Sequence, residues 1–252
     1  MWTSTRRSHA THATRSRRAG VAVAVLACVS LVACTATEPP SPAASAATAA
    51  ADTIAPFPQR GDIDAGTYLV TGYPVPFEIT VPDGWETFDG ASLGKDDPDL
   101  LPNTWDVALF FYPVTYVPTD ACAWRGALVQ IDPTAEALVD AMSAQASTVS
   151  TPAVEVMVGD YAGFEFDHAA ESDADVTDCD FAKLCIYSDS AADCNGSWFD
   201  TGNVGDSQTY RTVDLNGERA VIAMGSDGAV NPALRTEARA TFDSIEFVRP
   251  DE

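Results

Sequence analysis

Few side chains in this chain have the types and spacing that chemistry requires, and His168 is the first of them. It is the only histidine after residue 33 and stands in the segment FEFDHAAESD, so a Ser/His/Asp hydrolase would have to use it as general base. It also follows Phe164 and Phe166 at alternate positions, which share one face of an expected strand. A hydrogen-bonded histidine at the rim of the core is the simpler interpretation. We predict no catalytic residue.

Carboxylates form a second group with chemical potential. Acidic clusters at 95–99, 171–180 and 200–206 could supply oxygens to calcium, or two carboxylates could flank a groove as in glycosidases. None of the clusters has the spacing of a calcium-binding loop. Solvated loops explain them, and we predict neither a metal site nor a cofactor. A surface hydrolase that uses paired carboxylates or His168, and a calcium-stabilised adhesion module, remain alternatives.

Four cysteines follow the first 34 residues: Cys122, Cys179, Cys185 and Cys194. An even number in an exported chain predicts two disulfides, for which three connectivities are possible. Residues 185–194 have the pattern of a strand, a polar turn and a return, which favours a Cys185–Cys194 bond and leaves Cys122 for Cys179. Four zinc-bound thiolates are the alternative, but the paired spacing of zinc sites is absent.

The charge distribution excludes one class of partner. The formal net charge is −23, and all 37 acidic residues but only nine of the 14 basic ones follow Cys34. A surface of this kind repels phosphate backbones, so we predict no binding to nucleic acid.

Residues 1–33 have the features of a secretory signal peptide. Basic residues at 15–18 precede fifteen apolar or small residues, Ala19 to Ala33, too few for a transmembrane helix. The sequence Leu-Val-Ala-Cys that ends at Cys34 resembles the lipobox of bacterial lipoproteins. That resemblance implies cleavage between Ala33 and Cys34, a diacylglycerol on Cys34, and residence on the outer face of the cell membrane. A plain secretory signal with an incidental Cys34 is the alternative.

A linker and one domain are expected after the anchor. Prolines at 39, 40, 42, 56 and 58 and the lack of apolar periodicity predict that 34–64 is a disordered tether. Residues 65–249 then form a single α+β domain.

Strands predominate in the predicted domain. Phe77, Ile79 and Val81 alternate toward one face and end at a Pro-Asp-Gly turn, and 106–117 is the expected core strand, with Pro113 at its end or at a bulge. Further strands are expected at 153–158, 161–169 and 179–188. The clearest hairpin turns at Asn216-Gly217, which suits a type I′ turn.

Two helices should pack on the resulting antiparallel sheet. Asp132-Pro133 and Asn231-Pro232 each combine a capping side chain with proline at the first helical position. Leu138 and Met142 then mark the buried face of the first helix, and the second presents apolar residues at helical spacing: Leu234, Ala238, Phe242 and Ile245.

Large aromatic side chains are the remaining candidates for recognition. We expect Trp85 and Trp124 to be packed in the core, whereas Trp105 and Trp198 stand in polar segments and are the better surface candidates.

Five segments carry a resemblance to a family: FEITVPDGWE, DACAWRG, VMVGDYAGFEF, VDLNGERAVI and FDSIEFV. Together they resemble actinobacterial lipoproteins of the LpqN/LpqT type, whose domain is a PsbP-like α/β/α sandwich. The resemblance implies that fold and no enzymatic activity. We therefore expect a non-enzymatic binding or accessory module, held at the membrane by Cys34, with an envelope protein or an apolar ligand as its partner.

Overall fold

The computed structural model describes residues 54–100, 106–200, 205, 207–226 and 229–248. All of them belong to one compact unit, Ala50–Glu252. Its main element is an antiparallel sheet whose strands lie in the order β10, β12, β15, β16, β7, β6, β5, β2. Strand β11 also pairs with β12 and follows β10 along that edge. The bounds are β10 (Thr148–Ser150), β11 (Val154–Val158), β12 (Tyr161–Ala170), β15 (Ser207–Asp214), β16 (Arg219–Ser226), β7 (Val107–Phe110), β6 (Ser92–Lys95), β5 (Trp85–Thr87) and β2 (Gly61–Ile63).

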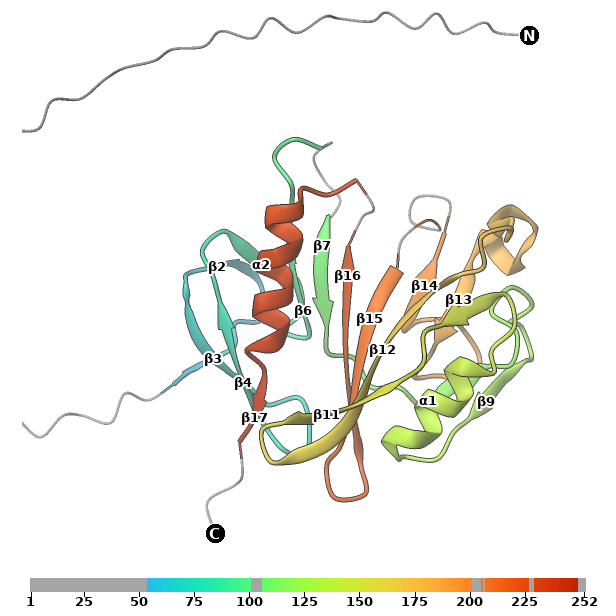
Figure 1. The fold of residues 1–252 in the computed structure, drawn as a ribbon, viewed down its shortest axis with the longest axis horizontal. Coiled ribbons are helices and arrows are strands. Elements are labelled where there is room, and N and C mark those ends of the chain that lie inside the picture. Colours follow the sequence, from blue (N-terminus) through green and yellow to red (C-terminus); the bar gives the residue numbers. More distant parts are fainter. Residues whose placement is uncertain (1–53, 101–105, 201–204, 206, 227–228, 249–252) are drawn as a thin grey trace, which may run out of the picture. The chain divides into compact units, whose positions relative to one another are not determined.

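A second, smaller sheet and helix α2 cover one face of the main sheet. Helix α2 (Pro232–Asp243) packs against β7 and β16 and also contacts the smaller sheet (Figure 1). The largest apolar cluster fills the space between them and includes Trp85, Leu109 and Phe242, all fully buried. The smaller sheet consists of β1 (Ala55–Pro56), β3 (Gly66–Val70), β4 (Phe77–Val81) and β17 (Glu246–Phe247).

Helix α1 (Ala135–Ser143) and two short hairpins cover the opposite face of β12 and β15. A second apolar cluster lies here and includes Leu138, Phe166 and Tyr210. Two 3₁₀ turns, at Val176–Asp178 and Asp180–Ala182, lie before the second hairpin. The hairpins are β8 (Tyr116–Pro118) with β9 (Leu128–Gln130), and β13 (Leu184–Tyr187) with β14 (Ser197–Phe199).

The broad α+β prediction is confirmed, and so are several of its details. Phe77, Ile79 and Val81 face the core from β4. Asn216 and Gly217 have φ of 62° and 98°, the positive values that a type I′ turn requires. Asn231 caps α2 through a hydrogen bond from the backbone N–H of Ala233.

The predicted tether is wrong for residues 55–63. These residues form β1 and β2, and Phe57 and Ile63 are buried in the main core at 7% and 3% exposure. Phe57 also packs edge-to-face on Phe111. Burial of two large apolar side chains outweighs the proline content that suggested a disordered segment. The ordered domain therefore begins at least ten residues before Ala65.

The predicted start of α1 is also wrong, because Thr134 rather than Asp132 caps the helix. The Thr134 hydroxyl accepts a hydrogen bond from the N–H of Ala137, and helical residues begin at Ala135. Arg219 donates to the carbonyls of both Asp132 and Thr134, next to the start of the helix. The expected strand 106–117 is divided as well, since β7 ends at Phe110 and Pro113 falls before β8.

Both disulfides join the cysteines expected from the sequence. Cys185–Cys194 closes the segment that precedes β14, and Cys122–Cys179 links residues 57 positions apart. Cys179 and Cys185 are buried. The two disulfides fasten the hairpins and 3₁₀ turns that, together with α1, cover this face of β12 and β15. Within the described part of the chain, no helix has both the length and the apolar content to span a membrane.

Candidate functional site

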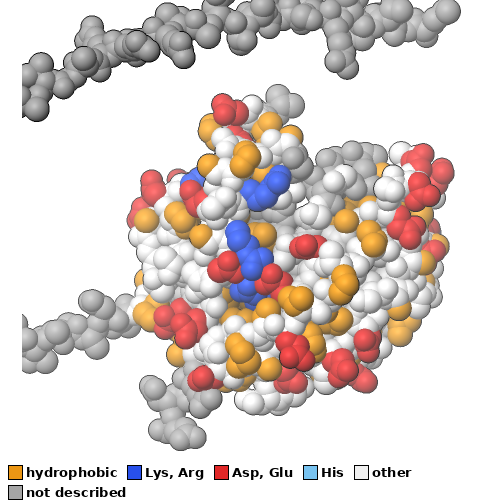
Figure 2. Space-filling model, in the orientation of Figure 1, with side chains coloured by type: hydrophobic (Ala, Val, Ile, Leu, Met, Phe, Trp, Pro, Cys, Tyr) orange, Lys and Arg blue, Asp and Glu red, His pale blue; other side chains and the backbone are white. Residues whose placement is uncertain are grey.

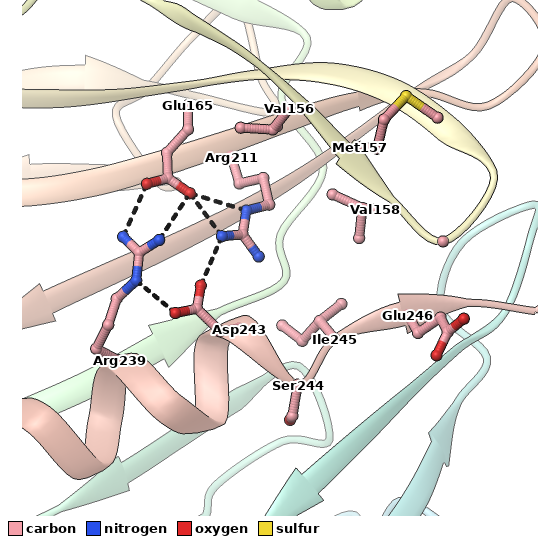
Figure 3. Close-up of a pocket in the computed structure, with 11 residues that line it drawn as sticks. Val156, Met157, Val158, Glu165, Arg211, Arg239, Asp243, Ser244, Ile245 and Glu246 are labelled. Atoms are coloured by element: carbon pink, nitrogen blue, oxygen red, sulfur yellow. Dashed lines mark hydrogen bonds and ion pairs between the residues drawn. The ribbon is translucent and has the colours of Figure 1, made fainter.

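Four charged residues gather where the end of α2 meets the main sheet. Glu165 on β12 lies directly opposite Arg211 on β15, and Arg239 and Asp243 stand one turn apart on α2. Figure 3 shows the four side chains converging. We call this group the ion-pair ring.

Each carboxylate in the ring bridges both guanidinium groups. Glu165 accepts from Arg211 Nε and Nη2 at 3.0 and 2.6 Å, and from Arg239 Nη1 and Nη2 at 2.8 and 3.2 Å. Asp243 accepts from Arg211 Nη2 at 2.8 Å and from Arg239 Nε at 2.9 Å. Arg211 also donates to the carbonyl of Phe242 and lies over its ring. The ion-pair ring thus fastens α2 to β12 and β15.

The ring is neutral in sum and partly buried. Exposed fractions of the side chains are 8% for Arg211 and 15% for Glu165, against 41% and 47% for Arg239 and Asp243. Burial alone would raise the pKa of Glu165, but hydrogen bonds and charge from Arg239 and Arg211 outweigh it and hold the pKa below its ordinary value. Glu165 is therefore ionised at neutral pH and unsuited to donate a proton as a general acid.

A cavity of about 590 Å³ opens beside the ring. Its other wall is formed by β11, the β11–β12 turn and the start of β17, which contribute Val156, Val158, Ile245 and Glu246. Gly159 lies in that turn with φ of 59°, and an added Cβ would meet the Phe247 carbonyl at 2.9 Å. Glycine thus lets the turn pack against β17. Figure 2 shows basic side chains along α2 on this face, with acidic ones beside them.

The neighbouring edge of the sheet is unusually apolar. Six large hydrophobic side chains are exposed among the described residues, and three of them, Val149, Val154 and Met157, lie on β10 and β11 at 55%, 57% and 65% exposure. Strand β11 pairs only with β12, so no strand of the described chain covers its other side.

His168 is part of the core and not of its rim, contrary to the sequence interpretation. It is fully buried, with Nδ1 hydrogen-bonded to Ser150 Oγ at 2.8 Å and Nε2 to Gln145 Oε1 at 3.2 Å. Burial lowers the pKa of His168 to about 4. Helix α1 and its following residues cover this face of β12, which is why the histidine is enclosed. The contacts explain His168 as a satisfied buried polar group.

Residues 90–95, GASLGK, match two nucleophile patterns that the sequence analysis missed. Ser92 is the serine of both G-x-S-x-G and S-x-x-K. The first pattern needs a turn from strand to helix, but Ser92 lies within β6 and pairs opposite Phe110. The second needs lysine near the serine, yet an offset of three on a strand puts Lys95 on the opposite face, where it bonds Glu237. Neither pattern has its structural context.

The other sequence candidates lie apart from the ring. Trp85 and Trp124 are buried as expected. Trp198 is half-buried, and the Nζ of Lys183 lies 4.3 Å from the centroid of its indole ring. Trp105, Ala33 and Cys34 lie outside the described residues. Among the residues that the structure describes, no three His, Cys, Asp or Glu side chains are grouped to hold a metal ion.

No family model matches the chain, and no curated protein matches it.

Proposed function

We propose that this protein is a lipid-anchored, non-enzymatic binding module at the outer face of the cell membrane, and that the edge formed by β10 and β11 receives an extended segment of an envelope protein. The exposed apolar edge carries the proposal. The lipobox at Cys34 supports the anchor, and the α+β architecture is consistent with the LpqN/LpqT resemblance and its PsbP-like sandwich.

Backbone geometry supports strand addition at this edge. In an antiparallel pair, alternate residues direct N–H and C=O groups toward the partner strand and the rest direct them away. Since β11 pairs only with β12, its outward groups can accept one more strand. Val154 is exposed on one face of β11, whereas Glu155 and Met157 share the other face, so an added segment would contact exposed side chains on both faces.

Charge favours a basic segment as the occupant over a second copy of this chain. Glu155 lies on the edge strand and Glu246 lines the adjoining cavity. The nearby Arg211 and Arg239 are already paired with carboxylates. Two copies with a formal net charge of −23 each would repel one another across this edge. An extended segment with alternating basic residues would complement it.

The candidate chemical groups favour binding over catalysis. Glu165 is bridged by two arginines, His168 is enclosed in the core, and Ser92 lies inside a paired strand. A nucleophile or acid–base catalyst must reach a substrate in a cavity. Glu165 and Ser92 do line cavities, but Glu165 is bonded to the two arginines and the Ser92 hydroxyl donates to Asp89, while His168 is fully buried.

Site-specific photocrosslinking in cells tests the proposal. A benzophenone amino acid at Met157 should crosslink a partner through an extended, net basic segment, whereas the same probe at Val129, exposed at 48% on β9, should not. Val154→Lys should abolish the Met157 crosslink, because it places charge on the edge. Val129→Lys is the matched control and should leave it intact.

The anchor is tested in the same cells. Cys34→Ser should move the protein out of the membrane fraction and weaken the crosslink. Equal crosslinking from Met157 and Val129, or a Met157 crosslink that survives Val154→Lys, would refute the edge as binding site. Equal membrane retention of wild type and Cys34→Ser would refute the lipid anchor and leave the edge proposal standing.

A further inference from the structure

A second cavity, of about 740 Å³, lies far from the β11 edge in the strand order of the main sheet. It is lined by residues of β5, β6 and β7 and of the loops that follow them: Glu86, Phe88, Asp89, Ser92, Asp96, Phe110 and Tyr112. In the sheet, four strands separate β6 from β11, namely β7, β16, β15 and β12. The cavity combines aromatic rings with carboxylates.

Three aromatic side chains, Phe88, Phe110 and Tyr112, line the cavity. Phe110 and Tyr112 stack with centroids 6.0 Å apart and an interplanar angle of 23°. Phe88 is 49% exposed, and the Nε of Arg60 donates to its carbonyl at 3.0 Å, which fixes the loop that carries it. Ring faces carry negative electrostatic potential and attract organic cations.

The carboxylate of Asp89 is held in place at this wall. It accepts hydrogen bonds from Tyr112 Oη at 2.5 Å, Ser92 Oγ at 2.8 Å and the Ala91 N–H at 2.9 Å. Burial alone would raise the pKa of Asp89, but these hydrogen bonds outweigh it and hold the pKa below its ordinary value. Burial and the bond to Asp89 raise the pKa of Tyr112 to about 12. The site thus keeps one fixed negative charge beside a neutral phenol.

We propose that this cavity binds an organic cation, with an ammonium or guanidinium group placed between the rings of Phe88, Phe110 and Tyr112 and the carboxylate of Asp89. Glu86 and Asp96 also line this cavity, and both line an adjoining one of about 460 Å³ together with Lys95. A quaternary ammonium headgroup and an arginine side chain share the required chemistry: a diffuse, weakly hydrated cation. The site is independent of the strand-binding edge.

Titration of the purified protein with choline, observed by saturation-transfer NMR on the choline methyl groups, tests the proposal. The neutral isostere 3,3-dimethylbutanol has the same shape without the charge and should bind at least about tenfold more weakly. Phe88→Ala removes an exposed ring, and Asp89→Asn removes the charge but keeps the acceptor atom. Each should weaken choline binding by about fivefold or more.

Asp140→Asn is the matched control, because it removes one charge from an exposed position of α1 and leaves the cavity unchanged. It should bind choline as the wild type does. Competition by arginine amide identifies the source: stronger binding than choline indicates a basic peptide side chain, and weaker binding indicates a quaternary ammonium. Equal binding of choline and its neutral isostere, equal losses in Asp89→Asn and Asp140→Asn, or no saturable binding of either cation would overturn the proposal.

Discussion

Glu165→Gln is the substitution that best isolates the contribution of the ion-pair ring to the unfolding free energy from that of the apolar core. The change keeps the size of the side chain and one acceptor oxygen, but it removes the charge that bridges Arg211 and Arg239. Breaking a buried ion pair costs about 3 to 5 kcal/mol, whereas exposed pairs contribute less than about 1 kcal/mol. Glu165 and Arg211 belong to the first class, and Arg239 is 41% exposed. We expect a loss of about 2 to 3 kcal/mol of unfolding free energy at pH 7.

The pH dependence follows from the direction of the pKa shift. The folded protein lowers the pKa of Glu165, so its stabilisation is complete above the pKa of an unfolded glutamate, about 4.3, and is lost as the pH falls through the folded pKa. The difference in stability between wild type and Glu165→Gln should therefore be constant from pH 7 to about 5 and shrink below about pH 4.

Urea denaturation followed by tryptophan fluorescence measures this difference without adding salt that would screen the pairs. Trp85 reports on α2, because it is buried and its indole N–H donates to Glu237 at 2.8 Å. Glu171→Gln, at an exposed position after β12, is the control and should change stability by less than about 0.5 kcal/mol. A Glu165→Gln loss no larger than that of the control, or a difference that persists unchanged at pH 3, would refute the assigned role of the ring.

The disulfides and His168 give further predictions. Replacing both Cys122 and Cys179 with serine should lower the unfolding free energy by about 4 kcal/mol, against about 2.5 kcal/mol for Cys185 and Cys194, because the loop closed in the unfolded chain is longer. Equal losses in urea titrations would contradict that explanation. The folded state lowers the pKa of His168 to about 4, so below the unfolded value of about 6.5 the unfolded chain binds a proton that the folded one does not. The unfolding free energy of the wild type should fall by up to about 3 kcal/mol between pH 6.5 and 4. His168→Asn should lack this fall. Parallel pH profiles of unfolding free energy for the two proteins would contradict the role assigned to His168.

Local signals predicted the elements that depend on neighbouring residues. The Asn216-Gly217 turn and the Asn231-Pro232 start of α2 each require particular residues at adjacent positions, and the structure has both. Alternation also identified the buried face of β4. The start of α1 was predicted two residues early because Thr134 competes with Asp132 as a cap, and it is the Thr134 hydroxyl that accepts the hydrogen bond from the N–H of Ala137.

Features that depend on distant contacts were not predictable from local pattern. Residues 55–63 look like a linker until Phe57 is placed against Phe111, more than fifty positions away. Glu165 and Arg239 are 74 positions apart, so nothing in either segment indicates the ring. The alternation pattern placed His168 on the same strand face as Phe166, but its complete burial depends on Gln145, which follows α1. For Ser92 the local pattern is misleading, because both nucleophile patterns that it matches require another structural context than the strand β6.

Asp243 gives a reason why the ring exists at all. It is the last residue of α2, where the helix dipole disfavours a negative charge, and a lone aspartate there would destabilise the helix. Arg239 and Arg211 reverse that effect, and by doing so they tie the end of α2 to the β12–β15 pair. The same bonds occupy the positive charges beside β11. Because the arginines are paired within the protein, they leave no net positive charge beside β11, which is what the proposed binding of a basic segment at that edge requires.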